Sequence, residues 1–170
     1  MRVRTETDVD RAAIRAVNEA AFGSGAEAEI VDALRAKGVE LVSLVADGDG
    51  AIVGHILFSP VSLVGHDGLD LMGLGPMAVL PREQRKGIGS ALVREGLRQC
   101  QQLGAQAVVV VGHPRYYPRF GFAPASRYGI RCEYDVPEDV FMVAELERGA
   151  LRAVSGLVRY DAAFGGPGQP

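Results

Sequence analysis

The sequence predicts an α/β fold, and two observations carry this prediction. Asp47-Gly48-Asp49-Gly50 separates two strand-like runs, 41–46 and 52–58, as in a β-hairpin. Further along, residues 69–111 read as a strand, a basic glycine-containing loop, a helix and an unbroken apolar strand. This order is typical of a βαβ unit, in which the two strands run parallel with a right-handed crossover.

The N-terminal part of the chain predicts one short strand and two helices. Residues 2–4 form the strand, and Thr7 is expected to cap the first helix with Asp10 as its partner in a short capping box. Gly38 is the expected stop of the second helix. Apolar residues recur at helical spacing in both runs: Ile14, Val17, Ala21, Ile30, Val31 and Leu34.

The strands that follow the helices are interrupted by proline. Pro60 is expected to end the run 52–58, and 61–64 is a candidate extension of the meander. The run 69–80 is again strand-like, but Gly75-Pro76 lies within it. Because proline removes a ladder donor, we expect a bulge or a local splay there.

The second half of the chain begins with a helix from Ile88 to about Leu103, which Gly104 ends. Its expected buried face holds Ile88, Ala91, Leu92, Cys100 and Leu103. Residues 107–111 lack alternation and predict a strand buried on both faces. Two closing strands are expected at 141–146 and 155–160. Residues 1–164 should form a single domain, and the glycine- and proline-rich stretch 165–170 a disordered tail.

The composition excludes several classes of protein. The formal net charge of −3 gives no reason to expect nucleic-acid or membrane binding. No apolar stretch reaches the length that spans a bilayer, and the N-terminal residues lack the pattern of a secretory signal, so a cytoplasmic location is expected.

Cys100 and Cys132 form no C-x-x-C pair, and two reduced thiols are expected. Three histidines far apart in sequence predict no metal site.

The segment 81–90 is the strongest candidate for a binding site. Gly87 and Gly89 allow close approach of a ligand and positive φ at the start of the helix. The first amides of a helix and its dipole form an anion site suited to a pyrophosphate. Basic side chains add positive charge there: Arg82, Arg85 and Lys86. The alternative interpretation is a helix start with two turn glycines and exposed basic residues.

Two other glycine motifs do not fit this segment. A P-loop has its lysine after the glycines, whereas Lys86 precedes them. A dinucleotide fingerprint needs a third glycine where Leu92 stands, and no acidic residue follows at the distance that binds a ribose. A nucleotide-binding α/β protein is therefore disfavoured.

Three elements together resemble the GNAT superfamily of N-acetyltransferases. Gln84-x-x-Gly87-x-Gly89 resembles the [QR]-x-x-G-x-[GA] signature, and 77–81 resembles the strand that leads into it. Downstream, 117–122 resembles the Y-x-x-[LF]-G-F motif. Residues 54–61 and 116–122 also resemble the YhbS-like branch, and the resemblance covers roughly 2–164.

The resemblance implies a GNAT-type fold and an activity. The fold would be a single mixed, twisted sheet whose central parallel strands splay apart, flanked by helices. The protein would transfer an acetyl group from acetyl-CoA to a primary amine by direct attack through a tetrahedral intermediate. Main-chain amides of Met77 and Val79 would bind the acetyl carbonyl and pantetheine. The implied cofactor-binding residues are Met77, Ala78, Val79, Gln84, Arg85, Lys86, Gly87, Ile88, Gly89 and Ser90.

The candidates for proton transfer are fewer. Tyr117 matches the family's tyrosine that acts as general acid toward the departing sulfur; the alternative is an aromatic residue packed under the loop. His113 follows the buried strand and is a possible base, or a loop histidine bonded to backbone. His55 is expected to pack within the sheet, and Glu27 and Glu29 to lie on a solvated helix face.

Several points stay open from sequence alone. A GNAT fold that binds acyl-CoA as a sensor or scaffold, without turnover, is the alternative to an enzyme. The acceptor could be a small-molecule or a peptide amine. A monomer and a homodimer are both compatible with the sequence.

Overall fold

The computed structural model describes residues 1–165 and divides into two compact units. Unit 1 comprises residues 1–58 and 75–99, and unit 2 comprises 59–74 and 100 onward. The single domain expected over 1–164 stays a prediction. The tail expected at 165–170 lies, apart from Gly165, outside the described residues.

Unit 1 contains three antiparallel strands. Strand β1 (Arg2–Thr5) pairs with β2 (Val42–Gly48), and β2 pairs with the first part of β3 (Ala51–Leu63). The predicted hairpin is confirmed, since the Gly50 amide donates to Oδ1 of Asp47 at 2.9 Å across the β2–β3 turn. The turn residues Asp49 and Gly50 have positive φ, as tight hairpin turns require.

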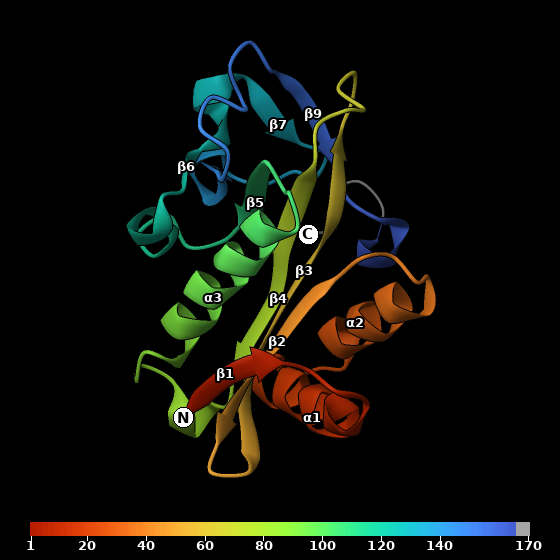
Figure 1. Ribbon diagram of the computed structural model, residues 1–170, viewed down its shortest axis with the longest axis vertical. Helices are drawn as coiled ribbons and strands as arrows, with labels where there is room; N and C mark the ends of the chain where they lie inside the picture. The colour runs from red at the N-terminus through yellow and green to blue at the C-terminus, as the bar shows by residue number, and fades with distance from the viewer. Residues whose placement is uncertain (166–170) are drawn as a thin grey trace. The chain divides into compact units, whose positions relative to one another are not determined.

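Helices cover both faces of these strands, as Figure 1 shows for α1 (Arg11–Phe22) and α2 (Ala26–Ala36) on one side and α3 (Ile88–Gln102) on the other. Successive residues of a strand point to opposite faces. A β-carbon at Gly54 would lie 3.1 Å from both Ile88 and Leu92 of α3. The next residue, His55, contacts Asn18 of α1. The glycine thus lets α3 approach the sheet, while His55 faces α1.

The expected capping box forms, but it closes a short 3-10 turn instead of capping α1 directly. The Thr7 amide donates to the Asp10 carboxylate at 2.7 Å, and the Asp10 amide donates to the Thr7 carbonyl at 3.0 Å. Helix α1 then begins at Arg11. Short 3-10 helices cover Asp8–Asp10, Pro81–Glu83, Tyr117–Phe120, Ala125–Tyr128, Glu138–Val140 and Ala162–Phe164.

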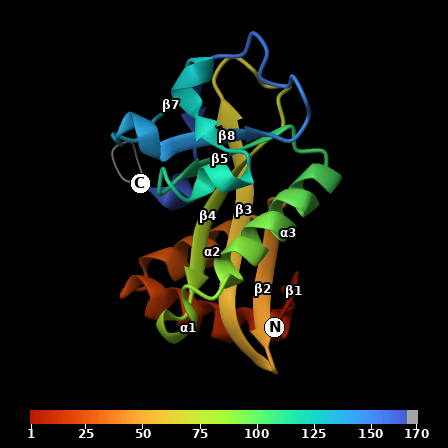
Figure 2. The same cartoon turned by 90° about the vertical axis from the view of Figure 1, so that its left-hand side faces the viewer.

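Unit 2 contains both parallel and antiparallel pairs. Leu71–Leu74 of β4 (Leu71–Val79) runs parallel to β5 (Ala107–Val111), and β5 runs antiparallel to β8 (Phe141–Glu145), beside it in Figure 2. The βαβ unit and the mixed sheet are therefore confirmed. The remaining strands are β6 (Ala123–Pro124), paired with β8, and β7 (Ile130–Cys132), parallel to β9 (Gly156–Arg159).

The pairing of β4 and β5 stops where the sequence predicted an interruption. The last paired residues are Leu74 and Val110, and Gly75 follows with φ +148°. The core of unit 2 is built on the same strands. It includes Val61, Leu63, Leu71, Ala107, Val109, Ala125, Ile130, Phe141, Val143, Leu151 and Val158.

Three expectations about the elements were wrong. Pro60 does not end β3, which continues to Leu63: Phe58 is the last residue paired with β2, and Ser62 pairs with β9. Leu103 does not share the buried face of α3, since it lies past the helix end and is 51% exposed. The strands β6 and β7 were missed, because two and three residues are too short to show a period.

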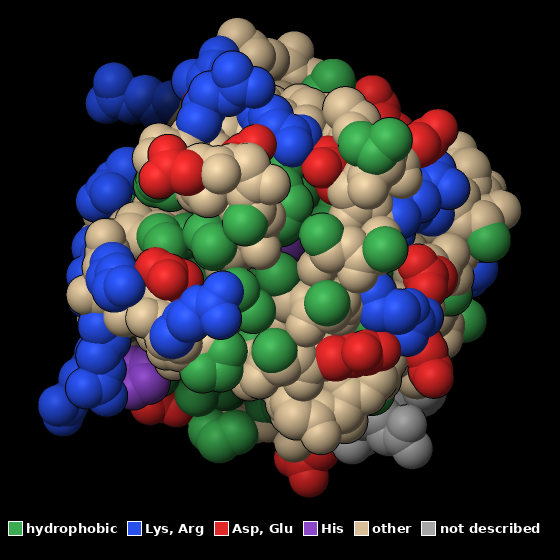
Figure 3. All heavy atoms as spheres, turned by 90° about the horizontal axis from the view of Figure 1, so that it is seen from below, with side chains coloured by type: hydrophobic (Ala, Val, Ile, Leu, Met, Phe, Trp, Pro, Cys, Tyr) green, Lys and Arg blue, Asp and Glu red, His purple; other side chains and the backbone are tan. Residues whose placement is uncertain are grey.

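The surface carries both signs of charge. On the face in Figure 3, Lys and Arg side chains are most frequent on the left-hand side, and Asp and Glu side chains lie among them and on the right. Arg15 of α1 pairs with Glu19 of the same helix at 3.0 Å and with Asp32 of α2 at 2.5 Å. Such exposed pairs contribute little to stability.

Candidate functional site

In unit 1, the end of β4 is tied to the glycine loop. The Gln84 side-chain amide donates to the Val79 carbonyl at 3.0 Å. The Leu80 amide donates to the Val53 carbonyl of β3 at 2.9 Å. Ala78 is buried, whereas Met77 and Val79 are half-buried, as expected for alternation along a strand. The structure therefore brings Val79 and Gln84, two of the predicted site residues, into direct contact.

The loop then turns into the N-terminus of α3. A hydrogen bond from the Ala91 amide to the Gly87 carbonyl at 3.1 Å closes the first turn of the helix, so the amides of Ile88 and Gly89 lie at its N-terminal end. Positive φ is confirmed at Gly87 (+86°) but was wrong for Gly89, which lies inside α3. Arg85 takes the other left-handed conformation, with φ +63°. The turn thus depends on Arg85 and Gly87.

Basic side chains surround this helix end. Lys86 pairs with the Glu83 carboxylate at 3.0 Å, and Arg82 lies 3.7 Å from the same residue. Arg85 is exposed and forms no ion pair within residues 1–165. The loop therefore carries three cationic side chains and one carboxylate. The excess positive charge adds to the field of the helix N-terminus. The arrangement suits an anionic ligand such as a pyrophosphate.

In unit 2, Tyr117 is held in an aromatic cluster. It is 7% exposed, and its ring meets Phe122 edge-on at 5.6 Å and Tyr116 at 5.1 Å between centroids. Burial, and then the neighbouring Tyr116, raises the pKa of Tyr117 to about 12. The phenol therefore keeps its proton at neutral pH, as a proton donor must.

His113 begins the loop that carries Tyr117. Its Nδ1 accepts from the Arg115 amide at 3.2 Å, and its carbonyl accepts from the amide of Tyr116 at 3.1 Å. With Nδ1 as acceptor, the neutral ring carries its proton on Nε2. Acceptance of a further proton would break the bond to Arg115. A base role for His113 stays a prediction.

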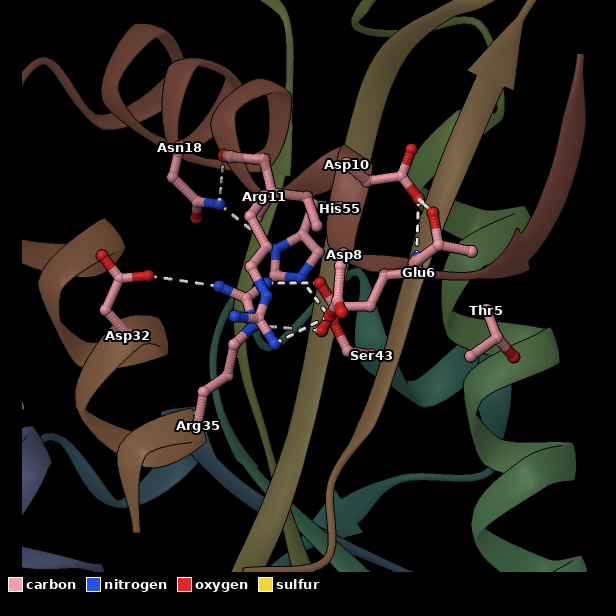
Figure 4. Close-up of polar contacts among 12 residues, drawn as sticks. Thr5, Glu6, Asp8, Asp10, Arg11, Asn18, Asp32, Arg35, Ser43 and His55 are labelled. Carbon is pink, nitrogen blue, oxygen red and sulfur yellow. Dashed lines mark hydrogen bonds and ion pairs between the residues drawn. The ribbon is translucent and has the colours of Figure 1, made fainter. Parts of the chain in front are cut away.

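His55 lies within a buried polar cluster in unit 1, drawn in Figure 4. The Asn18 amide donates to Nδ1 at 3.2 Å, and Ser43 Oγ lies 2.9 Å from Nε2. Burial, and secondly the positive charge of Arg35, lowers the pKa of His55 to about 3. His55 is thus neutral and links β3 to α1 and β2, as expected of a packed histidine. Arg35 in turn pairs with Glu6.

The remaining candidates show ordinary surroundings. Glu29 is exposed, and Glu27 is half-buried and accepts from Ser24 Oγ at 3.4 Å. Cys100 and Cys132 are free thiols, as predicted. Within residues 1–165, no three His, Cys, Asp or Glu side chains come together as metal ligands. Over the same range no helix is long and apolar enough to cross a membrane.

Gly112 is a candidate site residue that the sequence did not reveal. A β-carbon there would lie 2.3 Å from the Tyr117 ring. The sequence offered one signal for this role, namely that Gly112 directly follows the buried strand β5. Its role depends on the fold of the loop, which the sequence pattern did not specify.

Comparison with known proteins gives consistent results. The sequence profile of the Acetyltransferase (GNAT) family matches residues 11–122. The chain is 39% identical over 165 residues to the uncharacterized N-acetyltransferase YhbS of Escherichia coli K12, which covers 96% of this chain and 98% of the relative. It is 40% identical over 134 residues to the uncharacterized N-acetyltransferase YjhQ of the same strain, covering 76% and 74%.

Two solved structures are similar over nearly their whole length. The crystal structure of E. coli YhbS in complex with CoA has a TM-score of 0.91 and 38% identity, covering 96% of this chain and 91% of that one. A GNAT family acetyltransferase from Brucella melitensis in complex with acetyl-CoA has a TM-score of 0.79 and 40% identity, covering 96% and 97%. The fold, the loop at Gln84–Ser90 and these matches all agree. The chain belongs to the GNAT family of acetyltransferases.

Proposed function

We propose that this protein transfers the acetyl group of acetyl-CoA to a primary amine. The observation that carries the proposal is the open N-terminus of α3 with its left-handed turn at Arg85 and Gly87. The similar proteins from E. coli and B. melitensis were crystallised with CoA and acetyl-CoA. Both share about two fifths of their residues with this chain, so the same ligand is expected here.

The residues of unit 1 fit such a ligand. The amides from Arg85 to Ser90 would bind the pyrophosphate, with the helix dipole and the basic side chains adding attraction. Amides of Met77 and Val79, with Ala78 between them, would bind the acetyl carbonyl and pantetheine. Gln84 supports this arrangement by bonding the Val79 carbonyl. The proposed cofactor-binding residues are Met77, Ala78, Val79, Gln84, Arg85, Lys86, Gly87, Ile88, Gly89 and Ser90.

The proposed reaction is a direct transfer. The neutral amine nitrogen attacks the thioester carbonyl, and a carbon–nitrogen bond forms in a tetrahedral intermediate. Main-chain amides stabilise the negative charge on its oxygen. The carbon–sulfur bond then breaks, the amine loses a proton to water or a base, and the thiolate gains one. The products are an N-acetylated amine and free coenzyme A.

Tyr117 is the proposed general acid for the departing thiolate. Its pKa of about 12 keeps the phenol protonated over the range in which amines are neutral. Its aromatic contacts fix the ring. His113 remains the candidate base, with water as the alternative proton acceptor.

A turnover assay tests the proposal. Acetyl-CoA is offered with a panel of small amines, amino acids and peptides, and free thiol is followed over time. Acetyl-CoA hydrolysis without amine, measured in parallel, sets the background. Amine-dependent thiol release supports the enzyme. Coenzyme A binding with no release on any amine would favour the acyl-CoA sensor instead, and absence of coenzyme A binding would refute both.

A further inference from the structure

Unit 2 contains a cavity whose lining includes none of the residues proposed for acetyl transfer. It has a volume of about 670 Å³, within the range of small-molecule sites. It lies between the 3-10 helix Ala125–Tyr128, the end of β8 and the turn at 148–155. Its polar lining consists of Arg127, Tyr128, Glu145, Arg148, Arg152 and Ser155.

Glu145 is the one carboxylate in the lining of this cavity. Its Oε1 accepts a long hydrogen bond of 3.4 Å from the Tyr128 hydroxyl. Its Oε2 is buried and has no hydrogen-bond partner within residues 1–165. A buried carboxylate oxygen without a donor is costly, and most such atoms in proteins are paired. An ammonium group in the cavity beside Glu145 would offset part of this cost through charge attraction.

Three guanidinium groups line the same cavity. Arg127, Arg148 and Arg152 are exposed, and none of them forms an ion pair in the part of the chain that the structure describes. A guanidinium binds carboxylate or phosphate groups through two parallel hydrogen bonds. The lining therefore combines one carboxylate with three cations, which matches a ligand that carries both charges.

The cavity is separate from Tyr117 within unit 2. Glu145 pairs with Ala107, the first residue of β5, whereas Tyr117 follows Val111, the last residue of that strand. The four steps from Ala107 to Val111, at about 3.3 Å each, separate the two ends of the strand by roughly 13 Å. A ligand at Glu145 therefore does not occupy the position of the proposed general acid.

We propose that this cavity binds a small zwitterion, with its ammonium group on Glu145 and an oxyanion, carboxylate or phosphate, on the arginines. Isothermal titration calorimetry of the full chain tests it with phosphoethanolamine and β-alanine. Ethanolamine carries only the ammonium group of such a ligand, and inorganic phosphate carries only an oxyanion. At least one zwitterion should bind about tenfold or more tightly than either half, since it makes both charged contacts. The idea is overturned if phosphate binds as tightly as both zwitterions, or if neither zwitterion binds.

Variants locate the binding. Glu145→Gln should reduce zwitterion affinity to that of phosphate, and Arg148→Ala with Arg152→Ala should weaken it about tenfold or more. Arg159→Ala, an exposed arginine of β9 outside the cavity, is the matched control and should have no effect. Thermal melts confirm that each variant folds. Unchanged affinity in a folded Glu145→Gln protein refutes the site, as does displacement of the zwitterion by saturating coenzyme A.

Discussion

The ring of Tyr117 lies against the backbone of Gly112. A β-carbon at Gly112 would come within 2.3 Å of Cε2 of the ring, closer than any real contact. The Gly112 amide donates to the Val140 carbonyl at 2.9 Å, which anchors this stretch of backbone. Glycine at 112 is therefore what leaves room for the Tyr117 side chain.

Replacing Gly112 should impair catalysis through the position of Tyr117. Gly112→Ala forces the ring or the loop to move, and we expect kcat to fall about tenfold or more, because small misplacements of a catalytic group are costly. The KM for acetyl-CoA should change little. Gly68→Ala is the control, since a β-carbon there meets nothing within 4 Å. Equal kcat values for the two variants would show that the contact does not matter.

Removing the Tyr117 hydroxyl tests the proposed general acid. Tyr117→Phe keeps the ring contacts and should lower kcat about 100-fold, the usual size of an acid–base contribution. Tyr116→Phe, its packed neighbour, should stay within about twofold if Tyr116 is only structural. Because the pKa of Tyr117 is raised to about 12, wild-type turnover should show no loss of this acid up to pH 10. Similar kcat values for Tyr117→Phe and wild type would exclude the role.

Strain at the glycine turn should weaken coenzyme A binding selectively. Gly87 has φ +86°, and alanine there costs about 1–2 kcal/mol of backbone strain. Gly104, beyond the C-terminal end of α3, has φ +91°, and a β-carbon at either position meets no other atom. Both variants should lose similar thermal stability, but only Gly87→Ala should bind coenzyme A about tenfold more weakly in calorimetry. A matching loss in Gly104→Ala would attribute the effect to stability alone.

His55 should make the protein sensitive to acid. Its folded pKa of about 3 lies below the ordinary value of 6.5, so the unfolded chain binds the proton first as pH falls. The stabilising contribution is complete above about pH 6.5 and is lost as pH falls toward 3, by up to about 1.4 kcal/mol per pH unit. Urea unfolding of His55→Gln should show a shallower pH slope in this window. His66→Gln is the control, since His66 lies in the turn that follows β3 and outside the buried cluster. An unchanged slope in the His55 variant would refute the assignment.

Local patterns predicted most of the fold. The turn at Asp47–Gly50, the capping pair Thr7 and Asp10, and the unbroken run of 107–111 all act over a few residues, and the structure confirms each. The prediction that Pro60 ends its strand was wrong, because the effect of a proline depends on which neighbouring strand pairs with that part of β3. The strands β6 and β7 exist only through pairing with β8 and β9.

The site was predictable to the same extent. The proposed anion-binding loop was inferred from Gly87 and the helix that begins at Ile88, so its signal is contained in a few consecutive residues. The left-handed Arg85, the contact of Gly112 with Tyr117 and the unpaired oxygen of Glu145 depend on tertiary packing. No residue spacing encodes these features, so only the folded chain shows them.

The central claim is that acetyl transfer to an amine is the reaction of this protein. Its most direct test is mass spectrometry of the acceptor together with quantification of free coenzyme A in the same reaction. The proposal predicts equal amounts of N-acetylated acceptor and coenzyme A, both reduced about 100-fold in Tyr117→Phe. Coenzyme A formation without an acetylated acceptor, or binding of acetyl-CoA with neither product across the amine panel, would contradict it.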